Sequence, residues 1–348
     1  MSEIRVNNIT DTGGSTLLGR RNAIINGNFD VWQRGTSQTA TGYGSADRWK
    51  TQVGTSTQTV TQQAFTTGQT DVPYNPKYYY RNVVTTGSTA PSYVILNQFI
   101  EGVGSFAGET VTLSFYAKAD ASKNIAIEFS QQFGTGGSPS ATVNGIGVDT
   151  VSLTASWAKY TVTVSIPSIS GKTLGTDGND SLQLFIWLDA GSDYNARTNS
   201  LGNQSGTFDI AQVQLEKGSV ATDFERRSYG EELALCQRYY QRINGDYVYT
   251  RYSVGHIQST TALDGVYFFS QEMRGIPTLV TSSTASEFAI YKSGTVSICN
   301  ALPTLAAVGT TTTIGNITAS STGLTAGQGA VLIANNNTNT FMAFDAEL

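Results

Sequence analysis

Five stretches between residues 111 and 215 carry an apolar side chain at every second position. They are residues 111–118, 125–129, 160–166, 182–188 and 208–215. Successive side chains of a β-strand point to opposite faces, so this pattern predicts half-buried strands. Clusters of Gly, Asn, Asp and Ser separate the stretches, and no helical period lies between them. We therefore expect an all-β jelly-roll sandwich over residues 21–227, with a bulge where the alternation slips in phase within 208–215.

One segment breaks the alternation. Ser228 and Glu231 have the spacing of a capping box, in which the serine caps the first helical turn and the glutamate reaches back. Apolar side chains then follow at helical intervals, which predicts a helix over residues 228–243 that links two domains. These side chains are Leu233, Cys236, Tyr240 and Ile243. The helix either packs against its own sandwich or lies at a subunit axis; spacing alone favours packing, because so short a helix cannot hold a coiled coil.

Residues 244–348 return to aromatic and β-branched residues, which predict a second, small C-terminal β-sandwich. Residues 293–344 contain no charged side chain. An isolated β-domain normally carries surface charges that block edge pairing. The uncharged stretch therefore indicates a subunit contact or a partner-binding face, with a surface merely solvated by threonine and asparagine as an equal alternative. At the other end, residues 1–20 hold too few apolar side chains for a core and are expected to form an arm that either docks elsewhere or stays loose.

The charge pattern argues against nucleic acid and against membranes. The formal net charge is −5, only 14% of the residues are charged, and no basic patch is dense enough to neutralise a row of phosphates. No apolar run approaches the roughly 20 residues that cross a bilayer. The N-terminus lacks the basic and apolar regions of a signal peptide. We therefore expect synthesis in the cytoplasm, with neither a nucleic-acid partner nor membrane insertion.

Few residues have the spacing of catalytic groups. His256 is the only histidine, and no G-x-S-x-G motif occurs. A glycoside hydrolase needs two carboxylates facing the sugar. Asp177 with Asp180, and Asp189 with Asp193, are close in sequence, but they lie in Gly- and Asn-rich loops where aspartate commonly forms turns. We therefore expect no enzymatic activity and no cofactor.

Sugar binding requires exposed aromatic faces beside planar polar groups. Two predicted loops offer this combination. One contains a proline, and the other follows Trp187, which is itself expected in the core. The proline-bearing loop is equally suited to packing against a neighbouring chain. The candidate ligand-binding residues are Tyr74, Tyr78 and Tyr80 in the first loop, and Tyr194 and Arg197 in the second.

Four segments resemble the jelly rolls of carbohydrate-binding modules. Residues 25–30 are similar to the opening strand of those modules, and residues 108–119 to a central strand. Residues 156–164 resemble the strand that carries a core tryptophan, and residues 208–216 the closing strand. The segments occur in the family's order, so the resemblance implies a jelly roll of this kind for the first sandwich.

The same resemblance implies a structural calcium ion near the meeting point of the first and last strands. The matching oxygens here belong to Asn28, Asp30 and Asp209, with backbone carbonyls completing the shell. Ordinary hydrogen bonding at turns and strand ends is the favoured alternative, because two carboxylates make a weak calcium site.

A further set of segments resembles bacteriophage tail-fibre and other virion fibre proteins. They are residues 4–9, 26–35, 46–49, 214–218, 223–240 and 273–274. The resemblance implies a virion structural protein, usually a homotrimer, whose N-terminal arm attaches to other proteins of the particle and whose C-terminal domain points outward. It also favours a position at the trimer axis for residues 228–243.

The role implied by this family is adsorption to the host through a cell-surface glycan, by a protein exposed on the virion. Two alternatives share its motifs: a head fibre or capsid decoration protein, and a fibre that also depolymerises host polysaccharide. We place host recognition within residues 244–348, because an anchored N-terminus leaves this domain farthest from the particle.

Overall fold

The computed structural model describes residues 21–348, so the predicted arm at residues 1–20 lies outside the described residues. The described chain forms two compact units. The first unit runs to Tyr229 and includes Leu348, and the second unit is Gly230–Glu347. The division falls close to the predicted end of the first sandwich at residue 227.

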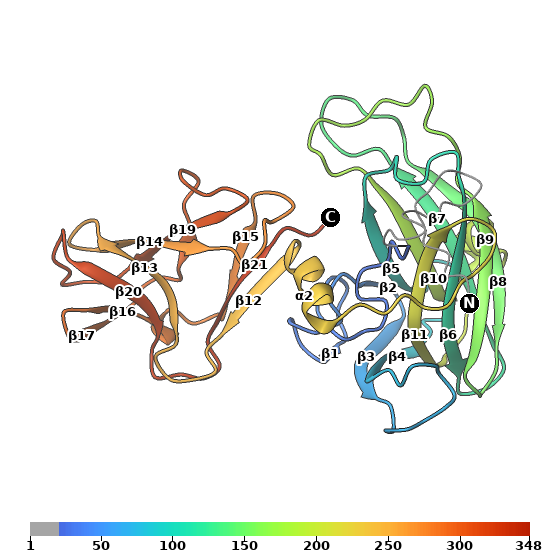
Figure 1. The fold of residues 1–348 in the computed structure, drawn as a ribbon, viewed down its shortest axis with the longest axis horizontal. Helices are drawn as coiled ribbons and strands as arrows, with labels where there is room; N and C mark the ends of the chain where they lie inside the picture. Colours follow the sequence, from blue (N-terminus) through green and yellow to red (C-terminus); the bar gives the residue numbers. More distant parts are fainter. Residues whose placement is uncertain (1–20) are drawn as a thin grey trace, which may run out of the picture. The chain divides into compact units, whose positions relative to one another are not determined.

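The first unit is a jelly-roll sandwich of two antiparallel sheets (Figure 1). The six-stranded sheet has the order β1-β3-β4-β11-β6-β9, and the five-stranded sheet the order β2-β5-β10-β7-β8. The first sheet comprises β1 Ser37–Gln38, β3 Thr57–Ala64, β4 Tyr78–Thr85, β11 Gly206–Lys217, β6 Thr110–Ala119 and β9 Ala158–Ser165. The second comprises β2 Lys50–Gly54, β5 Tyr93–Glu101, β10 Ser181–Ala190, β7 Lys123–Gln132 and β8 Val143–Leu153. The predicted all-β fold class is confirmed.

The alternating residues do form the core between these sheets. In β6, Val111, Leu113, Phe115 and Ala117 are fully buried in one cluster with side chains of the opposite sheet. Burying one face of each strand in this way removes apolar surface from water, which stabilises the fold by about 25 cal/mol for each Å² buried. The predicted bulge is also present, because the register of β11 against β6 shifts between Ala211 and Gln214.

The two ends of the first unit are tied to each other. The backbone N–H of Asn22 donates to Glu225 Oε2 over 2.8 Å, and Arg227 Nη1 donates to the Ile24 carbonyl over 3.0 Å. The Arg227 guanidinium also donates to the Asn22 carbonyl. The Ala23 N–H donates to the Leu215 carbonyl in β11 over 2.9 Å. The chain therefore enters and leaves the sandwich at one place.

The predicted helix over residues 228–243 is wrong in its extent. Helix α2 is Tyr229–Gln237, and the chain continues as strand β12, Tyr240–Asn244. Strand β12 pairs with β21, Phe341–Asp345, so a partner from the far end of the chain overrode the helical spacing. The predicted stripe Leu233, Cys236, Tyr240 and Ile243 is therefore divided between a helix and a strand. Tyr240 and Ile243, three residues apart in a strand, point to opposite faces.

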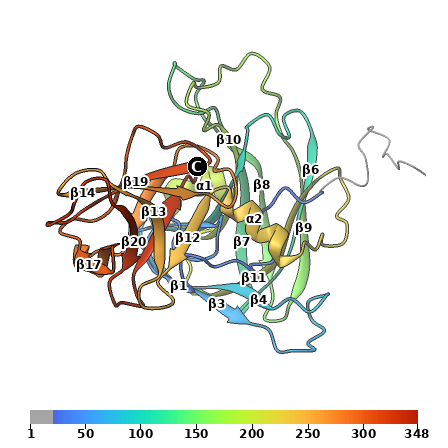
Figure 2. The same ribbon diagram turned by 60° about the vertical axis from the view of Figure 1, so that its left-hand side comes forward.

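The second unit is also a sandwich of two sheets (Figure 2), as predicted. A three-stranded sheet of order β12-β21-β15 faces one of order β17-β16-β20-β13-β14-β19-β18. Tyr267 of the larger sheet stacks on Phe344 of the smaller, with ring centroids 5.0 Å apart. The remaining strands are β13 Arg251–Ile257, β14 Ala262–Phe268, β15 Thr278–Thr281, β16 Phe288–Lys292, β17 Thr295–Ile298, β18 Thr304–Leu305, β19 Ile314–Ser320 and β20 Gly329–Ala334. A 3-10 turn, η2, covers Ala285–Glu287.

The outer face of the larger sheet carries apolar side chains across five neighbouring strands. Their positions are direct register partners, and we call them the apolar row. Val254 is 58% exposed, Val296 44% and Tyr291 39%. The row consists of Val296, Tyr291, Val331, Val254 and Val266. Exposed apolar patches of this kind mark interaction surfaces.

Within residues 21–348 there is no helix of sufficient length and apolarity to span a membrane.

Candidate functional site

The central strand of the five-stranded sheet is buried on both of its faces. All ten residues of β10 are buried. The inward side chains of β10 belong to the main core, whereas Phe185 and Trp187 point outward and form a second cluster with Ile95 of β5 and Ala126 of β7. The register places Trp187 opposite both Ile95 and Ala126. This second cluster is the floor of a cleft of about 310 Å³ on the outer face of the sheet.

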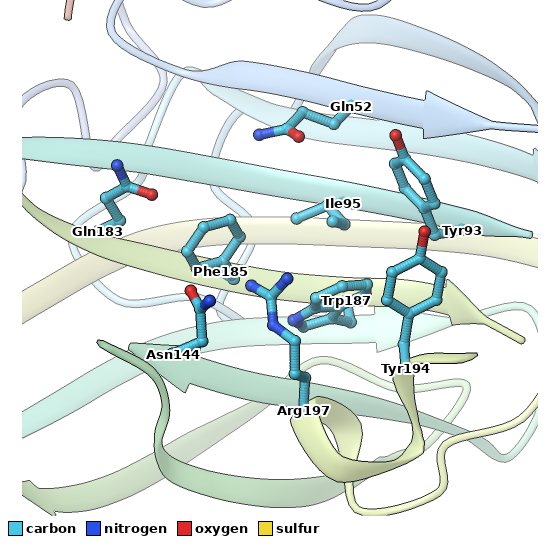
Figure 3. Close-up of a pocket in the computed structure, with 9 residues that line it drawn as sticks. All are labelled: Gln52, Tyr93, Ile95, Asn144, Gln183, Phe185, Trp187, Tyr194 and Arg197. Carbon is cyan, nitrogen blue, oxygen red and sulfur yellow. The ribbon is translucent and has the colours of Figure 1, made fainter. Parts of the chain in front are cut away.

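Polar and aromatic side chains stand around this floor (Figure 3). Figure 3 shows Tyr93 and Tyr194 together at one end of the cleft and Gln183 at the other, with Phe185 and Trp187 between them. Tyr194 ends the 3-10 turn η1, Ser192–Tyr194, and Arg197 lies in the short helix α1, Asn195–Thr198. The lining residues are Gln52, Tyr93, Ile95, Asn144, Gln183, Phe185, Trp187, Tyr194 and Arg197.

A buried carboxylate holds the guanidinium of Arg197 in place. Glu128 has a fully buried side chain and accepts two parallel bonds from Arg197, over 2.7 Å from Nε and 2.9 Å from Nη2. It also accepts from Trp187 Nε1 over 3.0 Å and from the Gly145 N–H over 2.7 Å. Such bidentate, charge-assisted pairs have a defined geometry. The guanidinium carbon lies 5.0 Å from the Trp187 ring centroid and 5.3 Å from that of Phe185, so aromatic faces fix its plane as well.

The two tyrosines form one aromatic wall. The Tyr93 and Tyr194 rings meet edge to face with centroids 5.2 Å apart, and Tyr194 also packs on Trp187 at 5.2 Å. Burial raises the pKa of the Tyr194 phenol, with Tyr93 and Asp193 acting in the same direction and Arg197 opposing. The hydroxyl therefore stays protonated at neutral pH and can both donate and accept a hydrogen bond.

Of the five predicted ligand-binding residues, the structure brings Tyr194 and Arg197 together in this cleft. Tyr93, Phe185 and Glu128 were not predicted to belong to a site. Trp187 was predicted to lie in the core; it is buried, but in the cluster that forms the floor of the cleft and not in the main core. A signal for the cleft floor exists in residues 184–188, because five consecutive residues are apolar there and both alternating phases are therefore apolar. That composition indicates a strand covered on both faces.

The prediction that Tyr80 binds a ligand is wrong. Tyr78 and Tyr80 lie in strand β4 and not in a loop. Tyr80 is fully buried in the main core, 5.4 Å from the Phe29 ring, and burial raises the pKa of its phenol far above the ordinary range. Tyr78 is half-buried, with the Lys77 ammonium 5.0 Å from its ring centroid. Tyr74 is 44% exposed, but it lines a different pocket.

The structure does not group the three residues that the resemblance assigns to a structural calcium ion, Asn28, Asp30 and Asp209. The Asp209 carboxylate is paired with Arg81 over 2.7 Å and with Lys118 over 3.7 Å, so a cation there would have to displace two positive side chains. Asn28 and Asp30 bond to each other and line a pocket that does not include Asp209. Among the described residues, no three His, Cys, Asp or Glu side chains are grouped to hold a metal ion.

No protein-family model matches the sequence, and no curated protein matches it. Solved structures similar to this chain include one described as CBM4, at 19% identity and TM-score 0.31, covering 56% of this chain and 98% of that one. A family 11 carbohydrate-binding module from Clostridium thermocellum, in complex with a mixed-linked tetrasaccharide, has 12% identity and TM-score 0.31 and covers 54% and 98%. The enzymatically active domain of tailspike protein 4 of bacteriophage CBA120 has 12% identity and TM-score 0.31, covering 57% of this chain and 21% of that one. At these identities and scores the functional residues must be judged from this chain alone.

Proposed function

We propose that the first unit binds a glycan in the cleft between Tyr93, Tyr194 and Arg197. Host recognition by residues 244–348, which the sequence favoured over the first sandwich, stays a prediction and would be a separate contact. The observation that carries this proposal is an aromatic floor and wall beside a guanidinium whose geometry is fixed by Glu128. A sugar ring offers C–H faces that pack on aromatic rings, and hydroxyls that pair with planar polar groups. Gln52, Asn144 and Gln183 provide such groups along the cleft. A volume of about 310 Å³ is at the lower end of the range for ligand sites, which suits a short sugar segment.

The proposed activity is binding without hydrolysis. A glycoside hydrolase needs two carboxylates at the scissile bond. The nine described residues that line the cleft include no carboxylate, and Glu128 beneath it is committed to Arg197, Trp187 and Gly145. A depolymerising fibre is the alternative, and the release of new reducing ends from a host polysaccharide by purified protein would favour it.

Replacing Tyr194 by alanine should weaken glycan binding at least about tenfold, or ~1.4 kcal/mol, because the change removes half of the aromatic wall. Binding is measured on an array of bacterial surface polysaccharides and then by calorimetry with the best of them. Tyr247→Ala is the matched control, since Tyr247 is 80% exposed in the second unit. Equal binding by Tyr194→Ala and wild type would contradict the proposal.

For the whole chain we propose a virion fibre protein that mediates adsorption to the host, with a head fibre or capsid decoration protein as the alternative. This proposal is supported by the segments that resemble phage fibre proteins. Its finer parts are a homotrimer, attachment through residues 1–20 to other particle proteins, and exposure of the C-terminal domain on the virion.

The apolar row supports assembly with further copies of the same chain. It ends on β17, a strand at the edge of the sheet that contributes Val296 and whose residues, Thr295–Ile298, carry no charge. The five residues of the row and the four of this edge include none of the charges that normally keep identical chains apart, and a neighbouring charge is Arg251, which lines a pocket with Tyr291 and Val296. Leu233, Cys236, Tyr240 and Ile243 are less suited to this role than predicted, because Cys236 and Tyr240 are buried within their own chain.

Deleting residues 1–20 should leave the two described units folded and the protein absent from virus particles, because this segment is the proposed anchor. Particles are assembled with the truncated or the full chain and compared by immunoblotting of purified virions. Incorporation of the truncated chain at the wild-type level would show that the anchor lies elsewhere.

A further inference from the structure

The first unit has a second cavity, which shares no residue with the glycan cleft. Its volume is about 380 Å³. Four separate segments of the chain contribute to it: the start of the first unit, the loop before β4, the bulge of β11 and the residues after β11. The side chains that define its chemistry are Asn28, Asp30, Tyr74, Lys77, Gln212 and Arg226.

Two buried amide oxygens belong to this pocket and have no hydrogen-bond donor among the described residues. Gln212 is 3% exposed; its Nε2 donates to the Pro73 carbonyl over 2.7 Å, which fixes the orientation of the amide and leaves Oε1 without a donor. Asn28 Nδ2 donates to Asp30 Oδ2 over 2.8 Å, and its buried Oδ1 likewise has no donor. Because an unsatisfied buried acceptor costs about 1–3 kcal/mol, two of them at one pocket indicate a ligand that donates hydrogen bonds.

The backbone around the pocket is also held in a costly conformation. Tyr74 has φ 66°, Asn75 φ 48° and Gln212 φ 49°, all in the left-handed region. A side chain in this region costs of the order of 1–3 kcal/mol, and such residues cluster at ligand sites. In β11 the bulge turns the Gln212 side chain out of the regular alternation.

The charges around the pocket are mixed. Burial raises the pKa of the Asp30 carboxyl, while Asn28, Lys77 and Arg226 oppose this effect. Lys77 and Arg226 are exposed donors, and the Arg226 guanidinium lies 5.8 Å from the Tyr74 ring centroid. Three positive side chains line the pocket, those of Lys77, Arg226 and Arg227, and they disfavour a metal cation. The Asp30 carboxyl and the amide oxygens of Gln212 and Asn28 disfavour an anion. A neutral ligand that both donates and accepts hydrogen bonds fits this set best.

We propose that this pocket is a second carbohydrate site, which takes a neutral pyranose with neighbouring free hydroxyls. The sugar hydroxyls donate to Gln212 Oε1, Asn28 Oδ1 and Asp30, and accept from Lys77 and Arg226. The exposed face of Tyr74 packs against the ring. This inference extends the proposed glycan function but rests on different residues, so either site can fail without the other. Two sites on one chain would strengthen attachment to a repeating polysaccharide through effective concentration.

The test uses the full chain and the methyl pyranosides of glucose, galactose and mannose as probes. Saturation-transfer NMR and calorimetry are run on wild type and on Tyr194→Ala, in which the cleft is impaired. We expect Tyr194→Ala to keep binding one of these glycosides. Adding Tyr74→Ala or Gln212→Met to that background should weaken the remaining binding at least about tenfold. Tyr74 is an exposed side chain, so its variant keeps the test valid if Gln212→Met does not fold.

Two results would overturn the proposal. One is unchanged glycoside binding after both pocket substitutions in the Tyr194→Ala background. The other is the absence of glycoside binding in Tyr194→Ala, whether or not calcium chloride, titrated alone, binds in a manner that depends on Asn28 and Asp30. If only the binding that depends on Tyr194 is absent, the second site is still supported. If only the binding that depends on Tyr74 is absent, the cleft is still supported.

Discussion

Replacing Glu128 by alanine should destabilise the first unit by about 3 kcal/mol and abolish glycan binding in the cleft. Removing one partner of a buried ion pair costs about 3–5 kcal/mol. We expect the lower end of this range, because the Arg197 side chain is 29% exposed and water can compensate part of its charge. The loss also leaves the Trp187 Nε1–H and the Gly145 N–H without their acceptor.

The sequence offers a direct way to measure this effect. All four tryptophans, Trp32, Trp49, Trp157 and Trp187, lie in the first unit, so tryptophan fluorescence during denaturant unfolding of the full chain reports on that unit. Glu109→Ala is the matched control. Its pair with Lys217 is exposed, 43% and 41%, and should contribute less than about 1 kcal/mol.

Glu128→Gln separates packing from charge. The amide keeps the size of the side chain and an acceptor oxygen, so we expect a smaller loss of stability than for alanine. Glycan binding should still fall, because the amide cannot make two charge-assisted bonds to Arg197. Wild-type affinity in a folded Glu128→Gln protein would show that the fixed guanidinium does not contribute to binding.

Placing lysines at Val254 and Val296 should convert the proposed trimer to a monomer. Both side chains lie in the apolar row, and association would bury their charges without a partner. We expect the association to weaken at least about a hundredfold, or ~2.7 kcal/mol. Sedimentation velocity at micromolar concentration measures the change directly.

Val308→Lys is the control for this experiment, since Val308 is 84% exposed and lies outside the row. A wild-type protein that sediments as a monomer would contradict the trimer itself. A double variant that still sediments as a trimer would show that the row is not the interface.

The strands could be predicted because their alternation reports a local property, the burial of one face. Val111, Leu113 and Phe115 occupy such positions, and the phase slip before Val213 marked the bulge. The extent of α2 could not be predicted this way. Tyr240 and Ile243 satisfy a helical period, but their strand partner β21 is about a hundred residues away, and single-sequence periodicity cannot detect such a pairing.

The candidate site shows the same limit. Tyr194 and Arg197 are close in sequence and were found together, whereas Tyr93 and Glu128 reach the cleft only through the register of β5 and β7 against β10. The prediction for Tyr80 was wrong because neighbours in sequence do not share a face of a strand. Tyr80 is one of three consecutive tyrosines, but strand alternation points its ring into the core.

The ties among Asn22, Ile24, Glu225 and Arg227 determine how the first unit responds to mechanical load. A load applied to the two ends of this unit would enter it near residue 22 and leave it near residue 229. Because the entry and exit segments are bonded to each other, these few polar contacts share the force before the sheets do. Pulling on the two chain ends is therefore expected to open this junction before it separates the strands that carry the cleft, β5, β7 and β10.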